Sequence, residues 1–215
     1  MGLHDIHLRA RLTQPGCELW DRRLGVHTFG HHPGTGGPGD REWYMHYIPS
    51  SYRDVFAVLR RAGIAADDVV TDVGSGLGRV AFAAAWAGAG KVEGVELIGG
   101  LVERAEANRR GSRLSARDIR FTANDARQHD YGATTLLYMF HPFGHEIVAE
   151  MLEKVRRDRE AARERRALRI AYVNPVADEV LQASGWLEKV ETIPATPQRW
   201  SSADHYLTSI WRSVD

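Results

Sequence analysis

The feature that most constrains the fold of this chain is a glycine-rich turn between an apolar run and an amphipathic stretch. Residues 69–72 have the composition of a buried strand, and Gly74, Gly76 and Gly78 follow on alternate positions before a stretch with helical character. Glycine suits such a turn because it adopts left-handed backbone conformations and lets a ligand approach the main chain. The pattern therefore predicts a strand, a ligand-facing loop and a helix, which together form a unit of an α/β domain.

The sequence after this turn alternates short apolar runs with amphipathic stretches, which predicts strand–helix units and a mostly parallel sheet. Strands are expected at residues 69–72, 91–96, 119–123, 135–140, 169–174, 186–193 and 206–214, and helices at residues 79–87, 101–110, 145–166 and 176–184. Another helix should begin after Ser50 or Ser51 and end at Gly63. No helix separates the last two strands, so we expect a seven-stranded sheet with an antiparallel last strand and helices on both faces.

The N-terminal part of the chain has a different character. Residues 1–49 lack sustained periodicity, and residues 30–39 are rich in glycine and proline, which favours loop structure. We interpret residues 1–49 as a lid or loop segment that precedes a single catalytic domain at residues 50–215. Aromatic and histidine side chains near the junction either line a lid over a substrate or pack against the following helix; they are Tyr44, His46, Tyr47 and Tyr52.

Composition narrows the class of protein. The 215 residues are 43% hydrophobic, enough for one sheet covered on both faces, and 28 basic side chains balance 28 acidic ones. No overall field therefore favours nucleic acid or a membrane as partner. Cys17 is the only cysteine, which excludes a disulfide framework, and no run approaches the roughly 20 apolar residues of a membrane span. We expect a soluble, cytoplasmic, unprocessed protein.

Two acidic residues stand where a nucleoside-binding fold places them. Asp72 ends the strand before the glycine turn, and Glu96 ends the next expected strand, where a carboxylate can accept hydrogen bonds from both ribose hydroxyls. The dinucleotide fingerprint requires a glycine at the position that Arg79 occupies. NAD therefore fits this loop poorly.

With Glu96, the run from Asp72 to Gly78 resembles the class I S-adenosylmethionine-dependent methyltransferases over about residues 50–215. That family is Rossmann-like and shares the expected strand order and antiparallel last strand. The resemblance implies that S-adenosylmethionine is the cofactor and S-adenosylhomocysteine its product. It also implies that the loop holds the methionine end, Glu96 the ribose and Asp125 the adenine amino group. The implied cofactor-binding residues are Asp72, Gly74, Ser75, Gly76, Gly78, Glu96, Leu97, Asn124, Asp125, Ala126 and Phe140.

The end of the fourth expected strand is where members of this family place substrate-facing and catalytic residues. This chain has His141 there, followed by Pro142 and Phe143, whereas many members that methylate amino or amide nitrogen have Asn or Asp before Pro-Pro and an aromatic residue. An imidazole lacks the paired donor and acceptor of an amide, which argues against an exocyclic amine such as adenine. His141 is either a general base or a residue that orders the turn, and Phe143 faces the substrate.

Three functions remain open from the sequence. The preferred one is methyl transfer to an oxygen or nitrogen of a small molecule, because the chain shows no RNA-binding module or basic arm. A protein methyltransferase of the lysine-modifying type and a non-catalytic module that binds S-adenosylmethionine are the alternatives. No metal is expected, since His31 and His32 diverge in a glycine-rich loop without further ligands. The basic stretch at 145–166 is interpreted as a solvated helix face with pairs such as Arg156 with Glu160.

Overall fold

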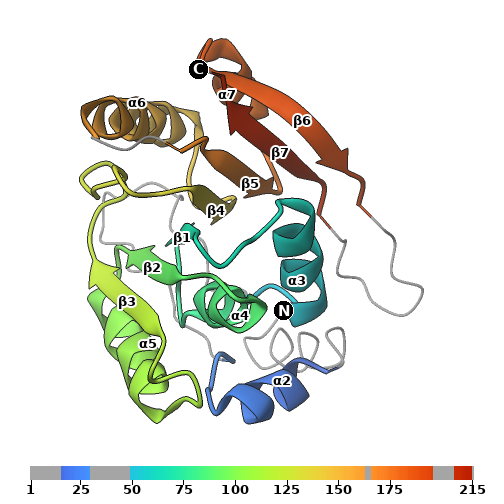
Figure 1. The fold of residues 1–215 in the computed structure, drawn as a ribbon, viewed down its shortest axis with the longest axis vertical. Coiled ribbons are helices and arrows are strands. Elements are labelled where there is room, and N and C mark those ends of the chain that lie inside the picture. Colours follow the sequence, from blue (N-terminus) through green and yellow to red (C-terminus); the bar gives the residue numbers. More distant parts are fainter. Residues whose placement is uncertain (1–15, 30–48, 163–165, 196–205, 215) are drawn as a thin grey trace, which may run out of the picture.

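The computed structural model describes residues 16–29, 49–162, 166–195 and 206–214, which form a seven-stranded sheet of order β3-β2-β1-β4-β5-β7-β6 (Figure 1). The strands are β1 (Val69–Val73), β2 (Lys91–Glu96), β3 (Asp118–Ala123), β4 (Leu136–Phe140), β5 (Arg169–Val173), β6 (Leu187–Ile193) and β7 (Thr208–Ser213). Strands β1 to β5 pair in parallel, and β7 pairs antiparallel with both β5 and β6. The predicted mostly parallel sheet with an antiparallel last strand is confirmed.

Helices cover both faces of the sheet, as predicted. One apolar core lies under α2 (Cys17–Leu24), α3 (Tyr52–Arg61), α4 (Arg79–Ala87) and α5 (Gly99–Gly111), and the other lies under α6 (His145–Ala161) and α7 (Asp178–Ala183). Figure 1 shows α4 and α6 on opposite sides of the central strands. The α6 helix ends at Ala161, earlier than predicted, because Ala162 already has extended backbone. Within the described ranges, no helix is both long and apolar enough to cross a membrane.

The chain order of the strands fixes where a ligand can bind. From β1 the chain continues outward through β2 and β3, then returns to β4 on the other side of β1. Such a reversal leaves a crevice at the carboxyl ends of the two central strands, where open α/β sheets bind their ligands. The glycine turn follows β1 and His141 follows β4, so both predicted motifs lie at this edge.

The expectation of irregular structure through residue 49 is wrong for the α2 helix. Leu24 and Val26 are fully buried in the core beneath α3 and α4, and Cys17 is also buried. Gly16 and Gly25 flank the helix with φ values of 91° and 73°, a conformation that favours glycine. Only eight residues long, α2 is too short to show sustained periodicity, although its two flanking glycines were a readable boundary signal.

A buried polar cluster joins the N-terminal segment to α3. The Asp21 carboxylate accepts hydrogen bonds from the Thr28 backbone N–H (2.8 Å), the Thr28 hydroxyl (2.7 Å) and the Tyr52 hydroxyl (2.8 Å). Tyr52 has no exposed surface, and burial raises the pKa of its hydroxyl. The prediction that Tyr52 lines a substrate lid is therefore wrong: its aromatic ring packs in the core and its polar end is held by Asp21.

Candidate functional site

The glycine turn between β1 and α4 has a backbone that only glycine adopts readily. Gly74, Gly76 and Gly78 have φ values of 76°, 54° and 87°. The N–H groups of Gly74 and Ser75 donate to the Val95 carbonyl at 2.8 and 3.1 Å, which ties the start of the loop to β2. A methyl group at Gly78 would lie 2.5 Å from the Phe121 ring. The sequence requirement for glycine thus has two causes, backbone conformation and the close approach of β3.

Hydrogen bonds link the N-terminal segment to this loop. The Asn108 side chain on α5 accepts from the His27 N–H (3.0 Å) and donates to the carbonyls of His27 (3.1 Å) and Leu77 (3.3 Å). Arg79, buried directly after the loop, donates to the Thr28 hydroxyl at 2.7 Å. Local sequence patterns do not reveal these contacts, because they join segments that are far apart in the chain.

Asp72, at the end of β1, is a buried carboxylate with one oxygen that no described residue hydrogen-bonds. It is 3% exposed, and its Oδ2 has no hydrogen-bond partner among the described residues. Burial, together with the nearby charge of Glu96, raises the pKa of Asp72 from its ordinary value of 3.8 to about 8. A buried carboxylate without a full set of partners is unfavourable unless a cation or a donor approaches. The position therefore fits the cationic methionine end of S-adenosylmethionine.

Glu96, at the end of β2, is turned toward the glycine loop. Its Oε2 accepts from the Gly76 N–H and its Oε1 from the Ile98 N–H, both at 3.0 Å. Each carboxylate oxygen can accept more than one hydrogen bond, so two hydroxyl donors can still bind. The predicted ribose role is compatible with this orientation, because the side chain is already fixed beside the loop.

The residues predicted to bind adenine are less preorganised for a ligand than Asp72 and Glu96. Leu97 is 49% exposed beside Glu96, and the Asn124 N–H donates to the Glu96 carbonyl at 3.0 Å, which brings the ends of β2 and β3 together. Ala126 is buried, and its carbonyl accepts from the Tyr131 hydroxyl at 2.7 Å.

Asp125 is directed at a neighbouring arginine in this structure. Its Oδ2 accepts from Arg127 Nη2 at 2.6 Å, and this hydrogen bond lowers the pKa of the Asp125 carboxyl. Arg127 also donates to Glu150 on α6 at 3.0 Å. The predicted role of Asp125 toward adenine thus requires sharing or replacing the Arg127 contact, which the sequence pattern did not reveal.

The acceptor end of the site follows β4. His141 has a φ of 35°, and its N–H donates to the Val173 carbonyl at 3.1 Å. Its Nδ1 lies 3.0 Å from the side-chain amide of Asn174, and partial burial lowers the pKa of the imidazole. A β-carbon added to Gly74 would come 3.3 Å from Pro142. The loops after β1 and β4 are therefore in contact through Pro142, the residue that follows His141.

Two further residues at this end were not predicted. Asn174 directly follows β5 with a φ of 50°, and Tyr206 precedes β7 with its ring 4.9 Å from the Phe140 ring. Tyr206 is 45% exposed, so this aromatic pair reaches the surface. Phe143 is partly buried against the core under α6. A polar residue after a parallel strand at the same edge as His141 was a signal that could have identified Asn174.

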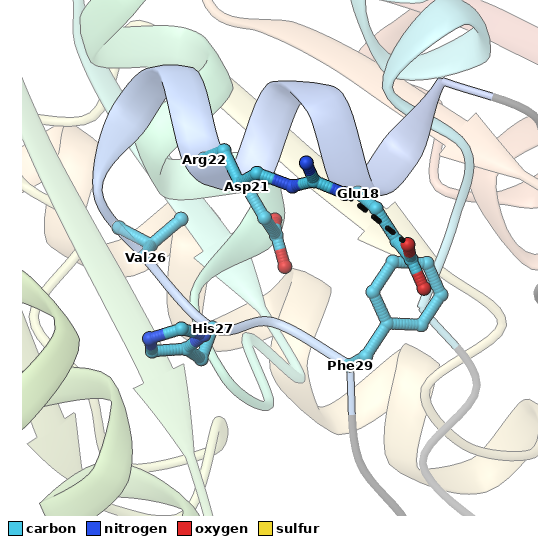
Figure 2. Close-up of a pocket in the computed structure, with 6 residues that line it drawn as sticks. All are labelled: Glu18, Asp21, Arg22, Val26, His27 and Phe29. Carbon is cyan, nitrogen blue, oxygen red and sulfur yellow. Dashed lines mark ion pairs between the residues drawn. The ribbon is translucent and has the colours of Figure 1, made fainter.

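A hollow of about 350 Å³ lies elsewhere, on the N-terminal segment (Figure 2). Its lining residues are Glu18, Asp21, Arg22, Val26, His27 and Phe29, and an ion pair between Glu18 and Arg22 (3.8 Å) lies along its wall. None of the predicted cofactor or acceptor residues lines it.

Some predicted residues lie outside the part of the chain that the structure describes. They are Tyr44, His46 and Tyr47 of the predicted lid, and the adjacent His31 and His32. Within the described ranges, no group of three or more His, Cys, Asp and Glu side chains is arranged to hold a metal ion.

No protein-family model matches this sequence, and no curated protein matches it. Solved structures do. An RNA methyltransferase from Salinibacter ruber in complex with S-adenosyl-L-homocysteine superposes with a TM-score of 0.60 at 17% identity, over 78% of this chain and 95% of that chain. An S-adenosylmethionine-dependent O-methyltransferase from Thermotoga maritima gives 0.59 at 17% identity, over 79% and 68%.

A third structure, magnesium protoporphyrin IX methyltransferase from Synechocystis PCC 6803 with bound S-adenosylmethionine, gives a TM-score of 0.54 at 19% identity, over 76% of this chain and 77% of that chain. Together with the strand order, these similarities define the class of fold. The chain has the Rossmann-like fold of the class I S-adenosylmethionine-dependent methyltransferases, as the glycine turn and the two strand-end carboxylates predicted.

Proposed function

We propose that this protein is an enzyme that binds S-adenosylmethionine at the carboxyl ends of β1 and β2 and transfers its methyl group to an acceptor beside His141. One observation carries most of the proposal. Asp72 places a carboxylate oxygen that has no hydrogen-bond partner among the described residues next to a loop of left-handed glycines, and Glu96 is hydrogen-bonded to the Gly76 N–H of that loop. This arrangement fits a ligand with a cationic end and a ribose.

The residues of the chain have few chemical tasks in such a reaction. When bound, S-adenosylmethionine supplies an electrophilic methyl group on a sulfonium, so that an acceptor lone pair forms the new bond while the carbon–sulfur bond breaks. The cationic end of the ligand lowers the raised pKa of Asp72 as it binds, so that the ionised carboxylate then holds it. Glu96 accepts from the ribose hydroxyls, and the loop after β4 positions the acceptor. Holding the acceptor in line and excluding water account for most of the rate that such an enzyme needs to provide.

A small molecule methylated on oxygen or nitrogen is the substrate class we propose. The structurally similar proteins include enzymes for RNA and for a porphyrin, so the fold leaves the substrate class open. Against nucleic acid, basic side chains of α6 pair with acidic ones on the same helix: Arg156 pairs with Glu153 at 2.9 Å and with Glu160 at 3.8 Å. A lid formed by Tyr44, His46 and Tyr47 and a cytoplasmic location are part of the same proposal.

Protein methylation of the lysine-modifying type and non-catalytic cofactor binding are the competing functions. A transfer assay with S-adenosylmethionine labelled in its methyl group, run against pools of metabolites, proteins and RNA, separates the three. We expect label in a small molecule, and the Asp72→Asn variant should transfer far less. Label only in protein or RNA would overturn the substrate class, and cofactor binding without any transfer would favour the non-catalytic module.

A further inference from the structure

Two non-glycine residues of the described chain have a left-handed backbone, and their side chains are hydrogen-bonded to each other. His141 has a φ of 35° and Asn174 a φ of 50°. The β-carbon makes this conformation unfavourable, so it persists where surrounding contacts enforce it, and such residues concentrate at functional sites. Their side chains meet with Asn174 Nδ2 at 3.0 Å from His141 Nδ1. The surrounding structure therefore holds these two residues in a defined arrangement.

The backbone around the pair explains why the two side chains meet. Strands β4 and β5 are adjacent and parallel, and their last residues, Phe140 and Val173, are register partners. His141 then donates its N–H to the Val173 carbonyl at 3.1 Å, and Asn174 donates its N–H to the Leu207 carbonyl at 2.9 Å. The backbone turns immediately after β4 and again after β5, and the imidazole and the amide are held against each other.

The orientation of the amide determines where the proton of the imidazole lies. An amide nitrogen only donates hydrogen bonds, so Nδ1 of His141 must offer its lone pair to Asn174. A neutral imidazole that accepts at Nδ1 carries its proton on Nε2. Partial burial lowers the pKa of His141, which favours the neutral form of the ring. The Nε2–H group has no partner among the described residues and is available to a ligand.

We propose that Asn174 is a positioning residue that holds His141 as a neutral Nε2–H donor, so that His141 binds a lone-pair atom of the methyl acceptor molecule instead of removing its proton. This inference rests on the proposed methyltransferase function. The acceptor molecule then carries a carbonyl, carboxylate or ring-nitrogen group close to the methylated atom. The proton displaced from the acceptor leaves to water, and the exposed Tyr206 ring, which packs against partly buried Phe140, offers a surface for a planar acceptor.

Nuclear magnetic resonance tests the proton position without any substrate. Long-range ¹H–¹⁵N spectra of the ¹⁵N-labelled full chain at neutral pH distinguish the two ring nitrogens of each histidine. Of the ten histidines, His141 is identified by the signals that disappear in His141→Gln, or by sequential assignment if that variant does not fold. We expect an unprotonated Nδ1 and a protonated Nε2. A protonated Nδ1 in the wild type would overturn the proposal and restore the general base.

Variants test whether Asn174 sets that position. In Asn174→Asp the carboxylate can only accept, so the proton should move to Nδ1. The matched control is Asn124→Asp, which changes the asparagine that follows β3 and should leave the His141 signals unchanged. Unchanged His141 signals in a folded Asn174→Asp would refute the role of Asn174. Calorimetry with S-adenosylhomocysteine on the same samples separates the two proposals, because a chain that fails to bind it contradicts the proposed function while the proton assignment stands.

Discussion

The two halves of the site differ in the atoms that form their surfaces: main-chain atoms in one and side-chain atoms in the other. In the proposed cofactor half, the main chain would make the binding surface, and three glycines give it a shape that other residues adopt at a cost. In the acceptor half, side chains make the surface, and His141 and Asn174 adopt left-handed backbone despite their β-carbons. The first half is suited to one ligand shared by many reactions. The second places particular donors and rings, and it is where a substrate would be selected.

The largest effect should come from removing the support behind the cofactor half. Deleting residues 1–42 removes Leu24 and Val26 from the core and takes Asp21 and Thr28 away from Tyr52 and Arg79. Each buried aliphatic side chain contributes about 1.5–3 kcal/mol, so the free energy of unfolding should fall by several kcal/mol. Urea unfolding measures the loss.

Deletion of residues 1–15 is the control for that truncation, because it leaves α2 intact. If the longer deletion were as stable as the shorter one, the N-terminal segment would be an appendage, and the cofactor loop would not depend on it.

Gly78→Ala should disturb the cofactor half of the site and leave the acceptor half unchanged. The added methyl group would meet the Phe121 ring at 2.5 Å in a backbone with a φ of 87°. We expect a loss of about 1–3 kcal/mol in unfolding free energy, the usual cost of overpacking, together with weaker cofactor binding. Gly99→Ala is the matched control, since no described residue outside its immediate chain neighbours and its own helix backbone lies within 4 Å of its added methyl group. Equal stabilities for the two variants would contradict the proposed role of this turn.

Asp72→Asn should weaken cofactor binding and stabilise the free protein at high pH. Losing a hydrogen bond to a charged group costs about 1.5–3 kcal/mol of binding energy. Because the pKa of Asp72 is raised from 3.8 to about 8, the folded wild type holds this proton more tightly than the unfolded chain between those values. The free energy of unfolding of the wild type therefore declines as pH rises from about 4 to about 8.

The asparagine variant lacks this decline, so its stability relative to the wild type should be greater at pH 9 than at pH 4. Thermal unfolding of both proteins across that range provides the measurement. A difference between them that does not change with pH would show that Asp72 titrates normally.

Arg127→Ala is the smallest change and sharpens the comparison at the adenine end. Its ion pairs join an exposed arginine to exposed Glu150 and to partly buried Asp125, so stability should change by less than about 1 kcal/mol. Freed of its partner, Asp125 should bind the cofactor equally well or slightly better. A tenfold loss of affinity by calorimetry would mean that Arg127 itself contacts the ligand.

The sequence predicted the sheet and the cofactor loop because their signals are local. Alternating apolar runs mark strands and helices, and glycines that must adopt left-handed backbone appear as glycines at fixed spacing. Other features depend on contacts between distant segments. The pairing of His141 with Asn174 needs β4 and β5 to be neighbours, and the burial of Tyr52 needs Asp21 from a helix too short to show a period.

Asp125 shows a third case. Its position after β3 was predicted correctly, but its partner Arg127 was not, because a side chain in a short turn can pair with any of several nearby charges. Local sequence patterns thus located the strand ends, and the side-chain partners there depend on three-dimensional packing.

Isothermal titration calorimetry of the full chain with S-adenosylmethionine, S-adenosylhomocysteine and NAD tests the central claim most directly. The wild type should bind the first two and not NAD, and Glu96→Ala, which loses the carboxylate beside the glycine loop, should bind both more weakly by about 1.5–3 kcal/mol while remaining folded. Binding of NAD without binding of either S-adenosyl compound, or an unchanged affinity in folded Glu96→Ala, would contradict the account.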